Sequence, residues 1–221
     1  TTSACGTRLT NEEMLLQSSY VGFDFNNIWK FNTGYLPCLR FHCVLFNPFP
    51  ITIPLKQNWN LISIPLVPQN NSIENVFGSI MDKIIVINSF EAGPGGGART
   101  YDPLLPEFSD LHNIDYLHGY WVKMNSSANL TITGTTSQNK TINLATNWNL
   151  ISYLCNSTKN VSDIFSGIMN KVIVINGFEN GALTYDPLLP EFSDLQELKP
   201  YYGYWVKMNQ TAVLDYSGVC F

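Results

Sequence analysis

The amino-acid sequence predicts a mainly β protein with two homologous, sandwich-like α+β modules that follow a short N-terminal segment. Three observations support this prediction. Long stretches of the sequence occur twice, each copy contains several β-branched or alternating runs, and each copy has one apolar stripe with helical spacing. A sheet face and a helix stripe must both be covered, so we expect each module to be a sheet assembly with one covering helix.

Three motifs define the duplication. NWNLIS at 58–63 recurs at 147–152, TYDPLLPEFSDL at 100–111 recurs unchanged at 184–195, and GYWVKMN at 119–125 recurs at 203–209. The spacing differs mainly because the first copy has a longer glycine-rich loop at 92–97, and surface loops tolerate such insertions. We therefore predict an aromatic and cysteine-rich segment at 1–50, a first module at 51–134 and a second module at 135–221.

The predicted strands follow one order in each module. An alternating run comes first, the NWNLIS run second, a β-branched run third, and the GYWVKM run with the apolar run after it last. The TYDP tetrapeptide is typical of a strand that ends in a turn. The runs IIVI at 84–87 and VIVI at 172–175 contain no polar residue, so we expect both strands to be buried on both faces.

Between the second and third strands, apolar residues recur at i, i+3, i+4, i+7 and i+8, which indicates one buried helix face. The members of this stripe are Ile73, Val76, Phe77, Ile80 and Met81 in the first copy and Val161, Ile164, Phe165, Ile168 and Met169 in the second. Ser72 and Asn160 directly precede the two stripes. Both residue types accept hydrogen bonds from first-turn amides, so we predict that they are the helix N-caps.

Composition disfavours two kinds of interaction. The 221 residues include 12 Lys and Arg against 17 Asp and Glu, and no basic run could follow a phosphate backbone, so nucleic acid is not an expected partner. No segment reaches the roughly 18 consecutive apolar residues of a membrane helix, so we expect no membrane span. A start at Thr1 without a charged and apolar leader suggests a mature or excised piece.

The cysteines and glycosylation motifs indicate an extracellular location. No C-x-x-C pair or Cys/His cluster is present, which favours disulfides over zinc or redox sites. We predict a bridge between Cys155 and Cys220, and one bridge with one remaining thiol among Cys5, Cys38 and Cys43. The N-x-[ST] motif marks seven candidate glycosylation sites, at Asn70, Asn125, Asn129, Asn139, Asn156, Asn160 and Asn209. The alternative is a polar-rich intracellular protein with buried thiols.

Repeated aromatic residues could form a surface for sugar stacking, because a flat ring and a pyranose face bury apolar groups together. Four tryptophans lie inside strand patterns, which favours core packing for Trp59, Trp121, Trp148 and Trp205. We therefore expect an exposed ligand-stacking surface to consist of four repeated tyrosines, Tyr101, Tyr120, Tyr185 and Tyr204.

No catalytic motif is evident. The sequence lacks the G-x-S-x-G, H-E-x-x-H, P-loop and Rossmann patterns. Of the three histidines, His112 and His118 are replaced by Gln196 and Tyr202 in the second copy, which excludes a duplicated histidine site. We therefore expect no enzymatic activity and no cofactor.

The repeated acids of the TYDPLLPEFSDL motif are the one constellation that could carry chemistry. Ca²⁺ accepts carboxylate ligands from irregular loops, so the candidate calcium ligands are Asp102, Glu107, Asp110, Asp186, Glu191 and Asp194. A glycosidase pair would need carboxyls that face each other across a cleft, which their adjacency on one loop disfavours. Structural roles in turns and caps explain these acids more simply.

The N-terminal segment has its own order of signals. LTNEEM at 9–14 predicts a short helix capped by Thr10 or Asn11, and the aromatic run at 20–29 with GYLP at 34–37 suggests a hairpin. In this order of residues, 9–41 resembles the element that closes repetitive β-helix regions in secreted adhesin-like proteins carrying the GLUG motif.

The duplicated region, residues 51–218, resembles the WNLIS…GYWVKM repeats near the ends of large predicted surface proteins, especially archaeal ones. This resemblance implies extracellular placement and a non-catalytic role. We expect a secreted or cell-surface structural or adhesive protein, either the terminal piece of a larger adhesin or a subunit of an extracellular filament or layer. Its expected partners are further copies, other surface proteins or glycans. The alternative is a carbohydrate-binding accessory module of a secreted enzyme.

Overall fold

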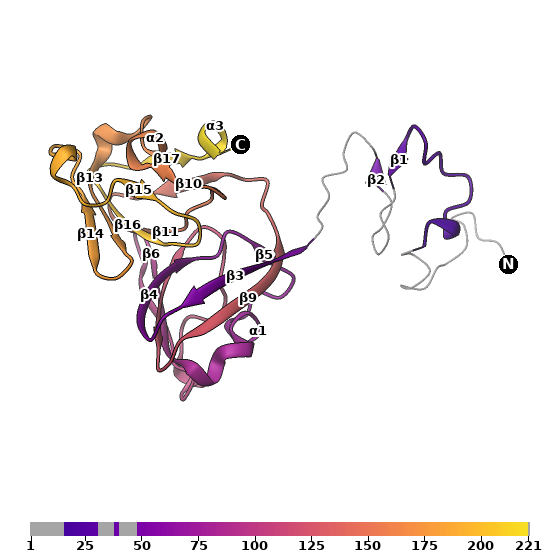
Figure 1. The fold of residues 1–221 in the computed structure, drawn as a ribbon, viewed down its shortest axis with the longest axis horizontal. Helices are drawn as coiled ribbons and strands as arrows, with labels where there is room; N and C mark the ends of the chain where they lie inside the picture. Colours follow the sequence, from indigo (N-terminus) through magenta and orange to yellow (C-terminus); the bar gives the residue numbers. More distant parts are fainter. Residues whose placement is uncertain (1–15, 31–37, 40–47, 221) are drawn as a thin grey trace. The chain divides into compact units, whose positions relative to one another are not determined.

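The structure, a computed structural model, describes residues 16–30, 38–39 and 48–220. The chain divides into two compact units, Thr1–Phe46 and Asn47–Phe221 (Figure 1). Both copies of the duplicated sequence lie in the second unit, which begins slightly before the predicted start of the first module. The fold is mainly β, with several antiparallel sheets and short helices, as the sequence predicts.

The described part of the first unit contains a short antiparallel strand pair. Its elements are the 3₁₀ helix η2 (Gln17–Ser19) and the paired strands β1 (Trp29–Lys30) and β2 (Cys38–Leu39). The ring of Phe23 contacts Tyr20, Phe25 and Trp29 at centroid distances of 4.6 to 6.0 Å. Of the residues predicted to form a hairpin, only Trp29 belongs to this strand pair, and both 34–37 and the helix predicted at 9–14 lie outside the described residues.

The first repeat of the second unit contains two antiparallel sheets, a three-stranded sheet of order β3-β9-β5 and a four-stranded sheet of order β4-β8-β6-β7. Its strands are β3 (Phe49–Leu55), β4 (Asn58–Ser63), β5 (Val67–Pro68), β6 (Ile84–Glu91), β7 (Gly97–Tyr101), β8 (Gly119–Met124) and β9 (Ala128–Thr135). Its helical elements are α1 (Ile73–Val76) and the 3₁₀ helices η3 (Gly78–Lys83) and η4 (Pro106–Phe108).

The second repeat has the same four-stranded sheet, of order β11-β16-β13-β14, with the two-stranded sheets β10-β17 and β12-β15. Its strands are β10 (Thr141–Leu144), β11 (Asn147–Ile151), β12 (Lys159–Asn160), β13 (Val172–Phe178), β14 (Ala182–Tyr185), β15 (Glu197–Leu198), β16 (Tyr204–Met208) and β17 (Ala212–Asp215). Its helical elements are α2 (Val161–Ile164), η5 (Met169–Lys171), η6 (Pro190–Phe192) and α3 (Ser217–Cys220).

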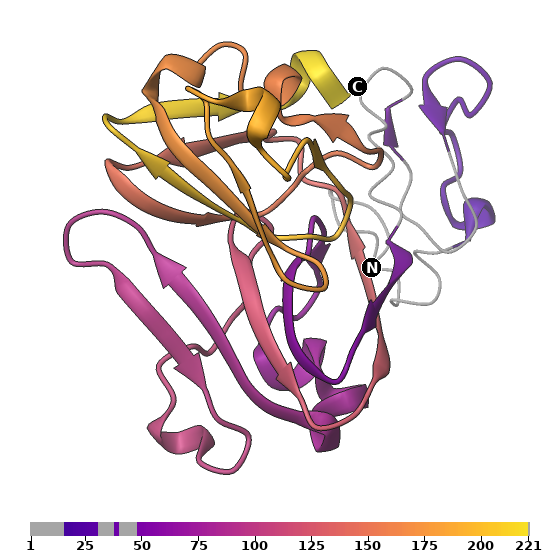
Figure 2. The same ribbon diagram turned by 60° about the vertical axis from the view of Figure 1, so that its left-hand side comes forward.

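Each repeat encloses its own hydrophobic core. Side chains alternate along a strand, so one face of each four-stranded sheet supplies core residues such as Val122 and Val206, while the smaller sheets and helices cover them. Figure 2 shows the two repeats as separate sheet assemblies, purple to salmon in the first and orange to yellow in the second. The prediction of sandwich-like modules is therefore confirmed at the level of the fold class.

The covering helix is shorter than its apolar stripe predicts. The α-helical geometry ends after Val76 and after Ile164, and 3₁₀ turns continue the segment. Gly78 and Gly167 lie just beyond these ends, and glycine is a poor helix former. Ser72 is the predicted N-cap and accepts a hydrogen bond from the Asn75 N–H at 3.3 Å.

Two further expectations need correction. Asn160 stands at the N-cap position of α2 without capping it, because its side-chain amide donates to the Asp163 carboxylate instead. The third strand of each repeat is buried on one face rather than on both, since Ile85 and Ile173 are each 43% exposed. Their β-branched runs reflect strand preference rather than complete burial.

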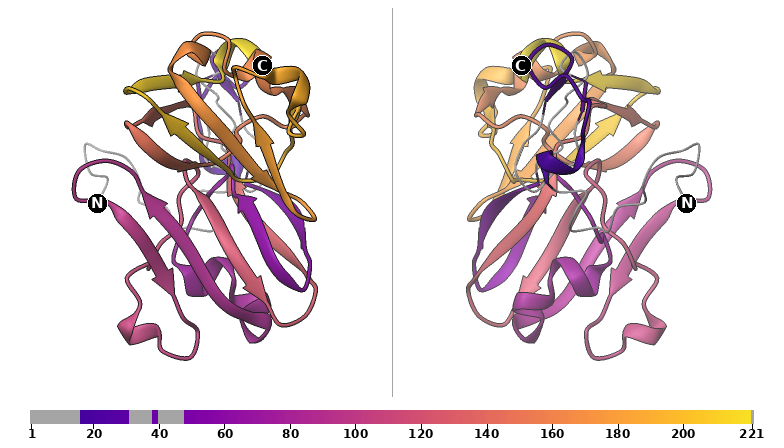
Figure 3. Two further views of the ribbon diagram at one scale, coloured as in Figure 1. Left: turned by 90° about the vertical axis from the view of Figure 1, so that its left-hand side faces the viewer. Right: turned by 90° about the vertical axis from the view of Figure 1, so that its right-hand side faces the viewer.

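The two repeats, which Figure 3 shows from two sides, contact each other through equivalent backbone groups. The N–H of Ser63 donates to the carbonyl of Tyr201 at 2.8 Å, and the N–H of the equivalent Ser152 donates to the carbonyl of Leu117 at 2.9 Å. Bridges join Ile62 to Tyr202 and His118 to Ile151. Reciprocal contacts of this kind are the pattern of a twofold interface, here formed within one chain.

Candidate functional site

Two aromatic clefts open on the outer faces of the four-stranded sheets. The first aromatic cleft is lined by Trp59, Asn88, Trp121 and Phe178, with a volume of about 340 Å³. The second aromatic cleft is lined by the equivalent residues Trp148, Asn176, Trp205 and Phe90, with a volume of about 380 Å³. Each cleft combines three residues of one repeat with a phenylalanine of the other, so neither repeat forms a complete cleft alone.

The tryptophans take the same geometry in both clefts. Trp59 and Trp121 meet edge to face with ring centroids 5.9 Å apart and planes at 89°, and Trp148 and Trp205 do so at 5.9 Å and 87°. The phenylalanine of the other repeat lies 5.1 Å from Trp121 in the first cleft and 5.2 Å from Trp205 in the second. These matched surroundings are what a duplicated architecture requires.

Strand alternation places these rings outside the core. Along β8, Trp121 lies between the core residues Tyr120 and Val122, and along β16, Trp205 lies between Tyr204 and Val206, so these rings point away from the core. Trp59 pairs with Lys123 and Trp148 with Lys207 across neighbouring strands. Trp59 is 37% exposed and the other three tryptophans are half-buried. The expectation that the tryptophans pack in the core is therefore wrong, because the core lies on the opposite face of each sheet.

An asparagine lines each cleft, and a lysine amine lies over one of its tryptophans. Lys123 Nζ lies 5.4 Å from the Trp59 ring centroid and Lys207 Nζ lies 5.4 Å from that of Trp148, within cation–π range. Asn88 Oδ1 accepts the Thr100 hydroxyl proton at 2.9 Å, as Asn176 does from Thr184 at 3.1 Å. This orientation leaves the amide N–H groups of Asn88 and Asn176 available as donors at the cleft surface.

The tyrosines predicted to form the stacking surface are buried instead. Tyr101, Tyr120, Tyr185 and Tyr204 are all 5% exposed or less. Tyr120 and Tyr204 use their hydroxyl oxygens to accept backbone N–H groups, from Asp115 at 2.7 Å and from Lys199 at 2.8 Å. Burial raises the pKa of both hydroxyls, in keeping with this structural role. The sequence analysis therefore places the tryptophans and tyrosines in strands correctly, but it assigns the tryptophans to the core face and the tyrosines to the exposed face, which is the reverse of the structure.

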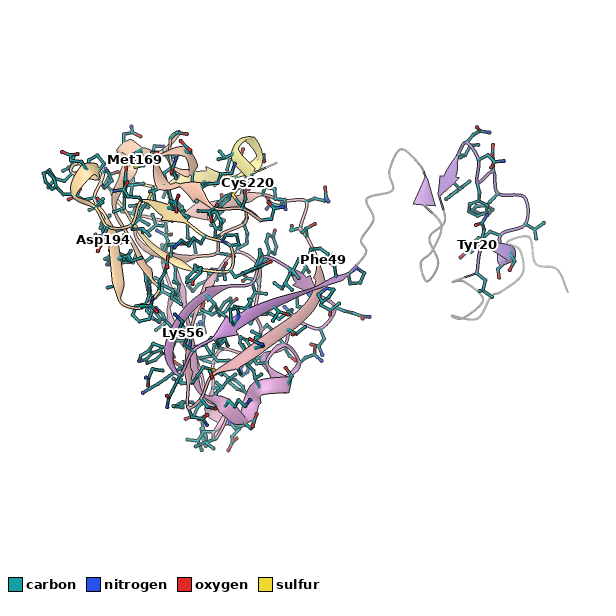
Figure 4. The ribbon with its side chains drawn as sticks, viewed as in Figure 1. Tyr20, Phe49, Lys56, Met169, Asp194 and Cys220 are labelled. Carbon is teal, nitrogen blue, oxygen red and sulfur yellow. A yellow bond between two sulfur atoms is a disulfide. The ribbon has the colours of Figure 1, made fainter. Side chains whose placement is uncertain are left out.

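The repeated acidic residues lie in two exposed apolar loops, which we define as residues 102–110 and 186–194. Leu104 and Leu188 are 88% exposed, and Phe108 and Phe192 are 81% exposed. Figure 4 shows the side chains of the second unit, with Asp194 labelled at the end of one loop. Apolar side chains this exposed make the two loops candidate interaction surfaces.

Hydrogen bonds within each loop fix its shape. Asp102 Oδ1 accepts the Leu104 N–H at 2.9 Å, and Ser109 Oγ accepts the Asp102 N–H at 2.9 Å and donates to the Leu105 carbonyl at 3.2 Å. Asp110 Oδ1 accepts the Thr100 N–H. The second loop repeats all of these bonds, with Asp186, Ser193 and Asp194 in the corresponding places.

These bonds also correct the candidate calcium ligands. Asp102, Glu107, Asp110, Asp186, Glu191 and Asp194 do not converge, and within 16–30, 38–39 and 48–220 no three His, Cys, Asp or Glu side chains gather as a metal site would need. The aspartates accept backbone N–H groups, so their oxygens serve the loop.

The structure also places the cysteines and glycosylation motifs. Cys155 and Cys220 are disulfide-bonded with their Cα atoms 5.1 Å apart, as predicted. Cys5 and Cys43 lie outside the described residues, and for Cys38 only the strand is described. All seven asparagines of the N-x-[ST] motifs are exposed, which glycosylation requires but does not by itself establish. Their occupancy stays a prediction.

The junction of the repeats contains an unpredicted polar cluster. His118 Nδ1 lies 2.7 Å from the Asp115 carboxylate, and His118 Nε2 lies 3.8 Å from that of Glu91. Burial lowers the pKa of His118, but the hydrogen bond and charge of Asp115, with Glu91, outweigh it and raise the pKa overall. The ring borders a hollow of about 720 Å³, also lined by Lys171 and Thr211. The second repeat has a Lys199–Glu179 ion pair of 2.7 Å instead.

Comparison with protein-family models, with curated proteins and with solved structures finds no match. The resemblance to closing segments of adhesin-like proteins and to surface-protein repeats therefore stays a prediction. Every helix within the described parts of the chain is too short or too polar to span a bilayer.

Sequence reasoning missed the residues that complete the clefts. Phe90 is the penultimate residue of β6 and Phe178 is the last residue of β13, and their role appears only when the other repeat is in place. Asn88 and Asn176 follow the β-branched runs at equivalent positions. The one available signal is that these polar and aromatic residues, like the tryptophans, are duplicated.

Proposed function

We propose that this chain is a non-catalytic extracellular protein of structural or adhesive type, which binds partners through its two aromatic clefts. The observation that carries the proposal is the pair of equivalent, solvent-open clefts whose polar groups are amides and amines. Aromatic rings flanked by a few oriented polar groups are typical of binding sites. Acid–base chemistry would need a titrating pair beside the bound ligand, and each cleft is lined by three aromatic rings and one asparagine.

Extracellular placement is supported by the Cys155–Cys220 bridge and by the exposure of all seven glycosylation motifs. Antibody labelling of intact cells of the native source, followed by non-reducing mass spectrometry of the purified protein, tests it. We expect labelling without permeabilisation, hexose-containing adducts and an intact Cys155–Cys220 peptide pair. Labelling confined to permeabilised cells would contradict the proposal.

A carbohydrate-binding accessory module is the second candidate, favoured by one observation. In each cleft an asparagine N–H donor lies beside an exposed tryptophan, at Asn88 with Trp59 and Trp121 and at the equivalent residues of the second cleft. Ring stacking with an adjacent hydrogen bond is the usual way of binding a saccharide.

A glycan array separates this candidate from the first. If the clefts bind saccharides, the double variant Trp59→Ala and Trp148→Ala loses the array signals of the unaltered chain. The matched control is Ile85→Thr with Ile173→Thr, which changes exposed apolar residues outside the clefts and keeps β-branched side chains. An array without signals from the unaltered chain would rule out the saccharide candidate.

A further inference from the structure

We propose that the occupant of each aromatic cleft is the exposed apolar loop of a second copy of this chain. This inference deepens the proposed function, since it rests on the clefts being binding sites and names their partner. It follows from four properties of the loops and clefts, which concern shape, charge, number and placement.

The loops have the shape of a preorganised ligand. Leu104 and Phe108 project from a turn that Asp102, Ser109 and Asp110 hold by side-chain hydrogen bonds to the backbone. A loop that is already ordered loses little conformational entropy on binding. Its two apolar side chains gain a favourable transfer from water only if an apolar surface covers them.

The clefts have the complementary shape and polarity. Each is a shallow, open cleft lined by three aromatic rings, an apolar surface that leucine and phenylalanine side chains can cover. No loop of the same chain fills them, because Leu104, Phe108, Leu188 and Phe192 are more than 80% exposed. Neither loop of the described second unit therefore occupies a cleft, and a loop of a second copy can reach it.

Charge also favours this pairing. Glu107 lies between the apolar side chains of the first loop and Glu191 between those of the second, and both are exposed. Lys123 and Lys207 stand over the tryptophans of the clefts. A carboxylate brought in with the loop would approach the amine that lies over Trp59 or Trp148, which gives the contact a preferred orientation.

The repeats preserve the exposed loop as strictly as the GYWVKM strand of the core, and more strictly than the helix. All twelve residues of 100–111 recur unchanged in 184–195, whereas buried positions such as Ile73 and Val76 are Val161 and Ile164 in the second copy. Packing constrains buried residues and leaves exposed ones free to vary. Identity at exposed Leu104 and Phe108 indicates that both loops meet the same kind of surface.

The number of loops and clefts, and the positions of the loops, indicate that this surface belongs to another copy of the chain. One chain carries two loops and two clefts, so copies satisfy each other without any further component. Figure 3 shows the loop after β7 and the loop after β14 at opposite ends of the second unit. Loops so placed cannot both enter one flat bilayer, but they can each reach a different neighbouring copy.

Sedimentation velocity over a range of protein concentrations tests the inference on the full chain. The loop variant combines Leu104→Ser, Phe108→Ser, Leu188→Ser and Phe192→Ser, and its fold is expected to persist because these side chains are exposed. The cleft variant combines Trp59→Ala and Trp148→Ala. We expect the unaltered chain to self-associate, and each variant to associate at least about 30-fold more weakly.

Mixing provides the decisive measurement. The loop variant keeps its clefts and the cleft variant keeps its loops. In the mixture, the loops of the cleft variant can bind the clefts of the loop variant, so association should return although each variant alone associates only weakly. Association through loops alone, or through clefts alone, would not be restored by mixing. The Ile85→Thr and Ile173→Thr control should associate like the unaltered chain. Circular dichroism identifies any variant that has failed to fold.

Charge reversal covers the case in which the cleft variant unfolds. Glu107→Lys with Glu191→Lys, and separately Lys123→Glu with Lys207→Glu, should each weaken association about tenfold, and mixing the two variants should restore it. A monomeric unaltered chain at all concentrations overturns the inference, as does a mixture that stays monomeric. Binding of phosphatidylcholine vesicles or array glycans by a monomeric chain would assign the loops or the clefts to those ligands instead.

These outcomes separate the inference from the proposed function. A monomeric chain that is labelled on intact cells leaves the extracellular role standing and removes only the partner. A chain that associates as expected but is labelled only in permeabilised cells keeps the partner and removes the extracellular role.

Discussion

At the scale of single residues, the NWNLIS motif assigns a different task to each side chain. Asn58 and Asn147 take positive φ angles of 74° and 72°, a backbone region that asparagine tolerates better than most residues. Two positions later, Asn149 is buried and closes the turn by bonding both the N–H and the carbonyl of Ala145. The tryptophan between them faces a cleft. The first asparagine of the motif thus takes the positive φ angle, the second closes the turn, and the tryptophan lines the cleft. These three roles explain why the motif recurs in both repeats.

The serine that ends this motif provides a test. Ser63 and Ser152 are fully buried, and among the described residues their hydroxyls have no hydrogen-bond partner. A buried hydroxyl without a partner is destabilising, so Ser63→Ala and Ser152→Ala should each raise the free energy of unfolding, by about 1 kcal/mol. Urea unfolding measures this change.

Ser72→Ala is the matched control for the serine variants. It removes the hydroxyl that caps α1 and should lower the free energy of unfolding by about 1 kcal/mol. A loss of stability in Ser63→Ala and Ser152→Ala comparable to that of Ser72→Ala would show that the buried hydroxyls are bonded after all.

At the scale of secondary-structure elements, local sequence pattern predicts where strands occur better than which way they face. The TYDP run is the predicted strand end, and the NWNLIS and GYWVKM runs are the predicted strands. Which face of a sheet becomes the core depends on the elements that pack against it. Trp59, which was expected in the core, is therefore exposed, and Tyr120, which was expected at the surface, is buried. Phe178 could not be predicted as a cleft residue, because the other repeat positions it.

At the glycine that begins each GYWVKM run, one repeat closely approaches the backbone of the other. A Cβ added at Gly203 would lie 2.7 Å from the Ile62 carbonyl oxygen, and one at Gly119 would lie 2.9 Å from that of Ile151. Both contacts are with backbone of the other repeat, which cannot move away as a side-chain end can. Gly203→Ala and Gly119→Ala should therefore lower the free energy of unfolding by about 1–3 kcal/mol.

Thermal unfolding and limited proteolysis between the repeats measure this effect. The added methyl groups strain the contact between the repeats, so the repeats should separate more often. Protease cleavage of the segment that joins them, between β9 and β10, should therefore become faster in Gly203→Ala and Gly119→Ala. Gly78→Ala and Gly167→Ala are matched controls, since an added Cβ at either position meets nothing within 4 Å. Unchanged melting and cleavage in Gly203→Ala would contradict the close approach of the repeats.

At the scale of the whole molecule, the junction is the place where the two repeats differ in chemistry. The first repeat contributes His118, held by Asp115, while the second contributes the Lys199–Glu179 pair in the related place. Lysine stays charged throughout the neutral range, whereas histidine changes charge within it. A molecule that is almost twofold symmetric therefore has a pH response on one side of its junction only.

The direction of this response follows from the two pKa shifts. Burial opposes the raised pKa of His118 and the lowered pKa of Asp115, and in both groups their mutual hydrogen bond and charge prevail. The His118 contribution to stability is complete below its unfolded pKa of 6.5 and disappears as pH rises through the higher folded pKa. The Asp115 contribution is complete above 3.8 and disappears as pH falls through the lower folded pKa.

Both contributions are thus present together between pH 3.8 and 6.5. We expect His118→Gln to lower the free energy of unfolding by about 1 kcal/mol near pH 5, the size of a charge-assisted hydrogen bond partly open to water, and to have a much smaller effect near pH 9. Chemical unfolding of both proteins across this range measures the difference. Lys199→Gln is the control, since its effect should not change between pH 5 and 9. A His118→Gln effect that grows as pH rises would mean that the neutral imidazole, rather than its ion pair, stabilises the junction.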